Sequence, residues 1–593
     1  MISVSYGAKY KNYPFYNWVP KPLGIILLIL LFIPILTVGG VYTANSGEMT
    51  SGLGIQSEHI QFVGFVTSIG MAAFSPFFYQ LVCIRREKMM CVVGFSLLYL
   101  LSYVCAVTDS IFVLALCSLI MGFLRMVLMM VNLFTLIRYA FGMEATRNIT
   151  PGNEPDDEQG WDRLDSEKSK SMPIIYLFFM ILGQLGTSLT AWLAYEYQWQ
   201  DVYYYMMGMT LVAILVVLVT MPYHAYNGRR FPITFRKFGN VAVFSSMMTC
   251  GIYVLVYGKT LDWFADPTIV RSTILTVVFA AVFFYMEWSH RSPYFLMEVF
   301  RLRTINMGIV LFLLLMVFNT SSMFVNVFTG IGMEIDNWQN AALGNWSMLG
   351  YFIGAVIAII LGSRNVKLKY LFGLGFLLIG VSTLFMYFEV QTAGLYERMK
   401  YPVIIRSTGM MLIYSLTAVY ANQRMPYKYL STWICIMLSV RMVIGPGIGS
   451  ALYSNVLQHR QQHYVTMFAP GCRPHRHADG FILRPDPAGN ALARGAARPR
   501  QRTWLPCRLR AKCRCRPRCR LSRRCRDGPS TAVLSQCSSY SFIHIRRGNY
   551  LLGATDGRPS QIILINLAAV KASAAMEKTT DEKGFGTACR IAA

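Results

Sequence analysis

The sequence predicts an all-α polytopic membrane protein with about thirteen transmembrane helices and a cytoplasmic N-terminus. Of its 593 residues, 54% are hydrophobic and 14% are charged. Soluble domains carry roughly 25% charged residues, so this composition is typical of a membrane protein. Two further observations support the prediction: apolar runs long enough to cross a bilayer recur along the chain, and Lys and Arg gather in alternate loops.

The apolar runs define the expected spans. A helix needs about 20 apolar residues to cross the hydrocarbon core. The runs that meet this requirement cover residues 23–42, 60–82, 89–107, 111–137, 174–195, 202–221, 241–258, 269–288, 305–328, 343–362, 370–388, 403–421 and 429–456. A polar start leads into the first run without a signal-peptide cleavage site, so we expect the first helix to act as its own insertion signal.

Lys and Arg residues in the short loops set the orientation. With the N-terminus inside, the inner loops hold most of the basic residues: Arg85, Arg86, Lys88, Arg229, Arg230, Arg236, Lys237, Arg291, Arg301, Arg303, Arg364, Lys367, Lys369, Arg424 and Lys428. The alternate loops are nearly bare, with Arg398 and Lys400 as the dense exception. Because cytoplasmic loops are enriched in basic residues, the N-terminus is expected in the cytoplasm. An acidic insert at 154–170, on the same side, is expected to be a solvated or disordered linker.

The composition changes abruptly around Ala469 and Pro470. The tail beyond holds 24 of the 55 Lys and Arg residues and eight of the 14 cysteines. It contains no Cys-x-x-Cys pair and little aromatic interleaving, which argues against a zinc site and against nucleic-acid binding without removing either alternative. The interpretation we favour is a different reading frame of the same gene, or an unrelated fusion.

Two arginines, Arg125 and Arg441, lie inside expected spans. An ionisable residue there costs several kcal/mol unless it is paired or hydrated. Each could bind an anionic substrate or modulate a carboxylate that carries a coupled proton; alternatively, each bonds to helix carbonyls or reaches a membrane edge. The acidic residues nearest the spans fall at span ends, and no proton carrier is named by the sequence: Glu48, Glu196, Glu287 and Glu389.

Other features inside the spans have two interpretations each. The run from Gly445 through Pro446 and Gly447 permits close helix packing, and also a local break of the kind transporters use near the bilayer midplane. Met126, Met129 and Met130 share one helix face by their spacing; an adaptable apolar pocket is possible there, but ordinary packing is the safer interpretation. No phosphate-binding loop, metal-ligand spacing or nucleophile constellation emerges, so we expect no enzyme, catalytic residue, metal or cofactor.

Three motif groups occur in order over residues 20–469. The first runs from YGKTLDWFADPTIV, with Trp263, through Glu287 to SPYFLMEVFRLRT, with Pro293. The second joins RSTGMML, with Arg406, to SVRMVIGPGIGSALYSNVL, and the third is LAYEYQWQDVYY. In order and spacing, these motifs resemble the major facilitator superfamily, and in particular its fourteen-helix branch of drug/proton antiporters.

The chain also departs from that branch's pattern. The loop after the second span keeps Arg85, Arg86 and Lys88 but lacks the usual Gly and Asp. Gly186 and Thr187 stand where the fifth helix of the branch has Gly-Pro, so the glycine is kept and the proline is not. Where the branch has an arginine in the fourth helix and an acidic residue in the first, this chain has Ser118 and Thr37.

The resemblance implies a major facilitator fold with fourteen helices, of which about thirteen are present. Its parts would be a cytoplasmic N-terminus (1–22), a six-helix half (23–222), two extra central helices with linkers (223–304), a second half lacking its last helix (305–469) and the basic tail (470–593), which is disordered or out of frame. Arg125, Arg441, Gly186 and Thr187 are the candidates for substrate binding or coupling. The other motif residues are expected to be structural: Arg85, Arg86, Lys88, Trp263, Glu287, Pro293, Arg406, Gly445, Pro446 and Gly447.

The function that the resemblance implies is secondary active transport, by proton-coupled efflux of lipophilic or amphipathic drugs across the plasma (inner) membrane. Expected partners are membrane lipid, a small-molecule substrate, protons, a periplasmic adaptor and an outer-membrane channel, with no cofactor and no nucleic acid. Two alternatives remain: solute uptake by the same fold, and a membrane-anchored nucleic-acid or metal-binding protein that acts through its tail.

Overall fold

A computed structural model describes residues 14–77, 87–141, 158–223, 235–289, 294–363, 368–390, 396–423 and 425–468. The chain divides into two compact units, one of residues 1–463 with 556–593, the other of residues 464–555. Only residues 464–468 of the second unit are described, so the architecture below is that of the first. The tail, with its cysteines and arginines, lies outside the described residues.

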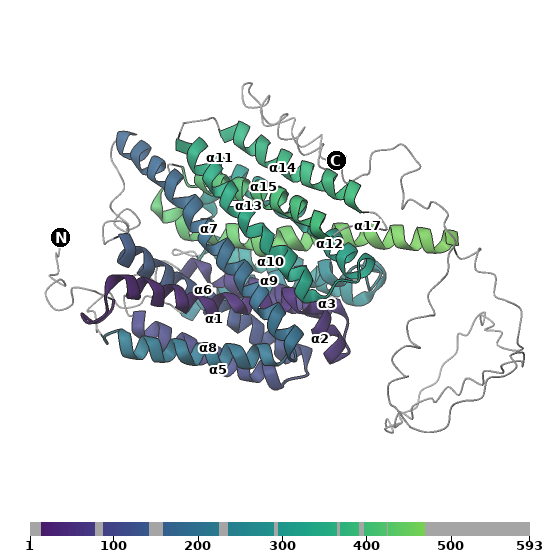
Figure 1. Cartoon of the computed structure of the whole chain (residues 1–593), viewed down its shortest axis with the longest axis horizontal. Helices are drawn as coiled ribbons and strands as arrows, with labels where there is room; N and C mark the ends of the chain where they lie inside the picture. The colour runs from purple at the N-terminus through teal and green to yellow at the C-terminus, as the bar shows by residue number, and fades with distance from the viewer. Residues whose placement is uncertain are drawn as a thin grey trace, which may run out of the picture. The chain divides into compact units, whose positions relative to one another are not determined.

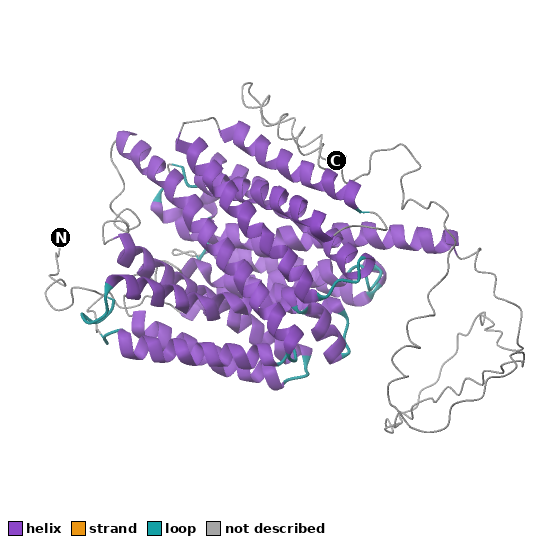
Figure 2. Cartoon of the chain, viewed as in Figure 1, coloured by secondary structure: helices purple, strands orange, loops and turns teal. Residues whose placement is uncertain are grey.

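Across the described ranges the regular structure is helical and contains no strand (Figure 2). Thirteen helical segments are long and apolar enough to cross a membrane, which confirms the expected all-α polytopic class. The main helices are α1 (Lys21–Ala44), α3 (Ser57–Phe74), α5 (Glu87–Val107), α6 (Ile111–Phe141), α7 (Glu158–Glu196), α8 (Asp201–Thr220), α9 (Phe235–Tyr257), α10 (Pro267–Ser289), α11 (Arg303–Thr320), α13 (Asn337–Ser363), α14 (Leu368–Glu389), α15 (Lys400–Ala421), α16 (Leu430–Ser439) and α17 (Gly445–Phe468). Shorter pieces include α2 (Ser46–Leu53), α12 (Ser322–Val327) and the π-helical turn η8 (Val440–Ile444), which joins α16 to α17.

The helices form two bundles with a matching packing pattern (Figure 1). In the first, α6 packs against α1, α3 and α5, and α1 packs against α7. In the second, α15 packs against α11, α13 and α14, and α11 packs against η8. The bundles meet where α7 contacts α13 and α15, and where α3 contacts α16 and η8; α9 and α10 pair with each other beside α3.

This repeat shows which helix the second bundle lacks. In the first bundle, α8 packs along α5. The counterpart of α5 is α14, and no helix among the described residues takes the place of α8 beside it. The described second bundle therefore has five helices where the first has six.

Small residues set the closest crossing in each bundle. A side chain on Gly70 of α3 or Gly122 of α6 would collide with the backbone of the other helix. In the second bundle, a side chain on Gly350 or Gly354 of α13 would collide with α15 in the same way. Because glycine lets two backbones approach closely, the two crossings are equivalent packing devices.

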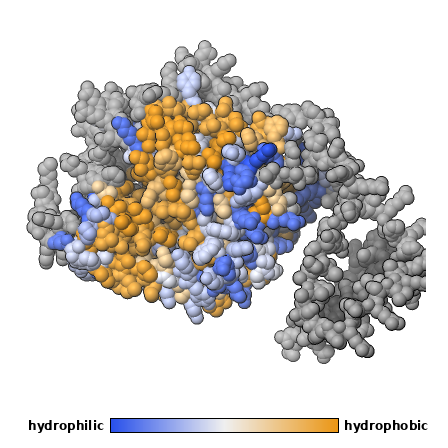
Figure 3. Space-filling model, in the orientation of Figure 1, coloured by the Kyte–Doolittle hydropathy of each residue, from blue (hydrophilic) through white to orange (hydrophobic). Residues whose placement is uncertain are grey.

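Apolar side chains cover much of the outer surface of the bundles (Figure 3). The most exposed of the spans is α10, whose Trp288 and Val277 are 92% and 64% exposed. A helix that is apolar all round and lies on the outside of a bundle fits contact with lipid.

Two sequence expectations were wrong in detail. The acidic insert is helical from Glu158 onward, because its Glu, Gln, Lys and Leu residues are good helix formers and extend α7. The expected span 305–328 is broken: α11 ends at Thr320, and α12 begins at Ser322.

Candidate functional site

Three arginines lie within candidate spans, and they define the chemistry of the interior. Arg125 comes from α6, Arg406 from α15 and Arg441 from η8. Within the described ranges, none of the three forms an ion pair with a carboxylate. Their surroundings differ, so each arginine is described in turn.

Arg125 reaches from α6 to α1. Its guanidinium lies directly over Gly39, where any side chain would occupy the same space. The Nε atom is buried and has no hydrogen-bond partner among the described residues. Gly39 therefore makes room for a charged group that the surrounding protein does not fully satisfy.

Arg441 lies in the other bundle and faces the same region. Its guanidinium carbon is 4.2 Å from the ring centroid of Tyr414 on α15, a cation–π contact. The charge of Arg441 is also close enough to that of Arg125 for the two to repel each other, and close to Tyr176 of α7. We call Arg125, Arg441, Tyr176 and Tyr414 the central site.

The turn that carries Arg441 owes its shape to the sequence that follows. Val440–Ile444 is a π-helical turn, and Pro446, one residue into α17, has no N–H with which to continue the α-helical pattern. A side chain on Gly445 would collide with Met316 of α11, and one on Gly447 would come within 2.7 Å of Ile252 of α9. The structure thus combines both expectations for this run, close packing and a local irregularity.

Arg406 is fully engaged by the break in α11. Its Nη2 donates to the carbonyl oxygen of Phe318 (3.2 Å), to the carbonyl of Asn319 and to the Ser321 hydroxyl (3.3 Å). These acceptors lie where α11 ends and its last carbonyls lose their helical partners. Arg406 therefore caps a broken span.

Gly186 and Thr187 lie where α7 crosses α1. A side chain on Gly40 of α1 would come within 3.1 Å of the Thr187 Cα and 3.3 Å of the Gly186 carbonyl oxygen. The Thr187 hydroxyl donates to the Gly183 carbonyl oxygen one turn earlier, at 3.0 Å. Thr37 likewise donates to Pro34, so this crossing presents little polar chemistry of its own.

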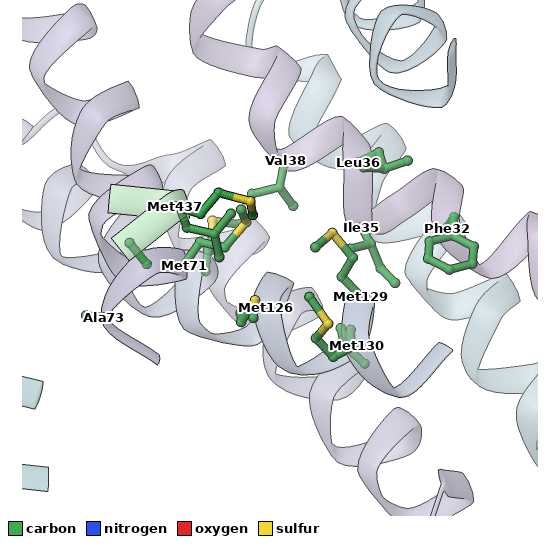
Figure 4. Packing of buried hydrophobic residues seen from close by; sticks show 14 of the residues in the cluster. Phe32, Ile35, Leu36, Val38, Met71, Ala73, Met126, Met129, Met130 and Met437 are labelled. Carbon is green, nitrogen blue, oxygen red and sulfur yellow. The ribbon is translucent and has the colours of Figure 1, made fainter. Parts of the chain in front are cut away.

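Methionines line the contact between the bundles beside the central site (Figure 4). Met126, Met129 and Met130 of α6 are buried, as is Met71 of α3. Met437 of α16 comes from the second bundle, and its sulfur accepts a hydrogen bond from the Tyr176 hydroxyl at 3.4 Å. The predicted methionine face therefore packs inside the protein, where flexible thioethers can adapt to different neighbours.

Motif residues near the expected inner edge make structural contacts. Lys88 donates to the carbonyl oxygens of Leu218 (3.0 Å) and Met221 (2.7 Å), at the end of α8. Glu287 is buried; it accepts from the Asn240 amide at 2.7 Å and from the backbone N–H of Phe295 at 3.0 Å. Arg85, Arg86 and Pro293 lie outside the described residues.

Trp263 joins the loop after α9 to the last span. Its indole N–H donates to Asn455 of α17 at 3.3 Å, and its ring packs against Gly258. Its φ of 54° is unusual for a bulky residue. These two contacts hold the loop in place on the expected outer side.

A contact between the bundles on that outer side involves Glu48 of α2. The Glu48 carboxyl group is hydrogen-bonded to Asn337 at the start of α13. Burial raises the pKa of Glu48, the Asn337 hydrogen bond lowers it, and the nearby charge of Asp336 adds to the rise. The sequence placed Glu48 near a span end but could not show that it faces the other bundle.

Sequence reasoning also missed the central tyrosines, because it assigned the aromatic surplus to the membrane interfaces. The available signal was the position of Tyr414, well inside the expected span 403–421. No cluster of three or more metal-ligating side chains occurs in the part of the chain that the structure describes.

Comparisons with known proteins give structural likeness alone. No family matches the sequence, and no curated protein does. A peptide transporter POT mutant in complex with alafosfalin is similar over 78% of this chain and 97% of that one, at 15% identity and a TM-score of 0.44. The nucleoside transporter NupG mutant is similar over 72% and 90%, at 12% identity and a TM-score of 0.45. The human organic anion transporter MFSD10 (TETRAN) is similar over 73% and 93%, at 12% identity and a TM-score of 0.42.

Proposed function

We propose that the chain is a secondary active transporter of the major facilitator superfamily, in which two bundles rock against each other around the central site. The carrying observation is that Arg125 and Arg441 come from different bundles and face the same region. The repeated packing pattern supports the proposal, because repeated halves with a site between them suit alternating access.

The finer proposal is proton-coupled efflux of lipophilic or amphipathic compounds across the inner membrane, with delivery to a periplasmic adaptor and an outer-membrane channel. Methionine and tyrosine side chains beside the central site support an apolar, adaptable substrate. Gly186 and Thr187 shape the adjoining α1–α7 crossing. Glu48 supports a proton-linked step, since it titrates at a contact between the bundles.

Transport by the purified full chain in proteoliposomes tests this proposal. A pH gradient is imposed, and movement of a panel of dansylated amphipathic compounds is followed in both directions. The proposal predicts substrate movement against the proton gradient that an uncoupler abolishes. Movement with the proton gradient would favour uptake, and no movement of any compound would contradict the proposed function.

A further inference from the structure

The central site concentrates positive charge without a matching negative charge. Arg125 and Arg441 repel each other across the contact between the bundles, and neither forms an ion pair within the described ranges. Two like charges inside a span are costly when nothing compensates them. An anion placed beside both guanidinium groups would remove this cost.

Two polar atoms at the site also lack partners. The Arg125 Nε and the Tyr414 hydroxyl are both buried, and neither has a hydrogen-bond partner among the described residues. Both can donate a hydrogen bond. The oxygens of a carboxylate, sulfonate or phosphate would accept from them, and charge-assisted bonds to arginine are among the strongest available.

The groups around these donors are apolar or aromatic. The Tyr414 ring packs edge-on against Tyr176 and Phe312, with centroids 5.1 and 5.4 Å away. Met437 lies against the Tyr176 hydroxyl, and Met126 is fully buried one residue after Arg125. Such surroundings favour an apolar body attached to the charged group.

From these observations we infer that the central site binds an amphipathic anion. Arg125 and Arg441 hold its acidic headgroup, and Tyr176, Tyr414 and Met437 contact its apolar body. This inference rests on the proposed function and narrows its substrate class. A cationic amphipath is disfavoured, because it would add a third positive charge to the site.

Binding of three related probes tests the inference directly. Dansylglycine carries a carboxylate, dansylglycinamide is neutral, and dansylcadaverine is a cation with the same fluorophore. Binding to the full chain in neutral detergent is followed by dansyl fluorescence, with empty micelles as the blank. We expect dansylglycine to bind at least about tenfold more tightly than the other two, since one charge-assisted hydrogen bond contributes about 1.5–3 kcal/mol.

Four variants locate that preference. Arg125→Gln and Arg441→Gln are each expected to weaken dansylglycine binding about 10- to 100-fold and to leave dansylglycinamide unchanged. Gly39→Ala should weaken it too, because the added methyl group displaces the Arg125 guanidinium. Gly183→Ala is the matched control: it adds the same methyl group to a neighbouring helix, beside open space.

The outcomes separate this inference from the proposed function. Equal binding of the three probes, or an unchanged preference in both arginine variants, would overturn the inference even if transport were observed. Selective, arginine-dependent binding without transport would support the site and contradict the transporter. Displacement of dansylglycine by phosphatidylglycerol would assign the site to an anionic lipid and overturn its assignment to a transported solute.

Discussion

The two bundles place an arginine on corresponding helices and treat it differently. Arg406 of α15 donates to the carbonyl oxygens of Phe318 and Asn319, where α11 is broken. Arg125 of α6 lies over an unbroken stretch of α1 at Gly39, and its Nε has no partner among the described residues. The same residue type in related positions thus caps a helix in one bundle and keeps unused bonding capacity in the other.

This difference separates a structural role from a binding role. A buried donor whose partners are built into the fold stabilises that fold, whereas a buried charge left unsatisfied destabilises it. Unsatisfied groups persist in proteins mainly where a ligand uses them. On this reasoning Arg406 belongs to the scaffold, and Arg125 belongs to the site.

The largest expected effect concerns what the bundles share. Gly122→Leu in the first bundle and Gly350→Leu in the second should each abolish the folded yield, because each places a side chain in the backbone of a neighbouring helix. Size-exclusion chromatography of detergent extracts measures this yield. Gly208→Leu is the control, since Gly208 has open space beside it; a normal yield for either crossing variant would break the equivalence of the two bundles.

A smaller loss of stability is expected when Arg406 is replaced. Arg406→Gln leaves the carbonyl groups at the α11 break without their donor, and should lower the free energy of unfolding by about 1–3 kcal/mol. Thermal unfolding in detergent measures it. Arg406→Lys, which keeps the charge but loses the planar donor group, should fall between the two.

The corresponding change at Arg125 should have the opposite sign. Arg125→Met removes an unsatisfied charge from a span and should raise the free energy of unfolding by up to about 2 kcal/mol, while it abolishes binding of anionic probes. Unfolding is measured as for Arg406. A loss of stability as large as that of Arg406→Gln would make both arginines structural and remove the contrast between them.

The smallest effect concerns the outer contact between the bundles. The raised pKa of Glu48 means that the buried, closed arrangement binds a proton more tightly than a solvated one, so lowering the pH should favour closure. Glu48→Gln should flatten the pH dependence of transport between about pH 5 and 8. Glu196→Gln removes an exposed carboxyl group at the end of α7 and serves as control; identical pH profiles for the two variants would contradict a role for Glu48.

Hydropathy and loop charge were sufficient to predict the spans, because crossing a bilayer constrains each segment separately. They could not predict that Arg125 and Arg441 face one another, since that depends on how two bundles pack. The break at Ser321 was also missed: the run 305–328 is apolar throughout, and the carbonyls released there are satisfied by Arg406, which lies 85 residues away in sequence. Tyr414 was overlooked because aromatic residues were assigned to the interfaces as a group.

Spin-label distances across the two ends of the bundles test the central claim, that the bundles rock around a site between them. Labelled unnatural amino acids at Ser51 and Gln339 report on the expected outer side, and labels at Lys170 and Lys369 report on the inner side; all four residues are exposed. Rocking predicts that adding dansylglycine or changing the pH shifts the two distances in opposite directions. Two distances that stay fixed, or that rise and fall together, would contradict it.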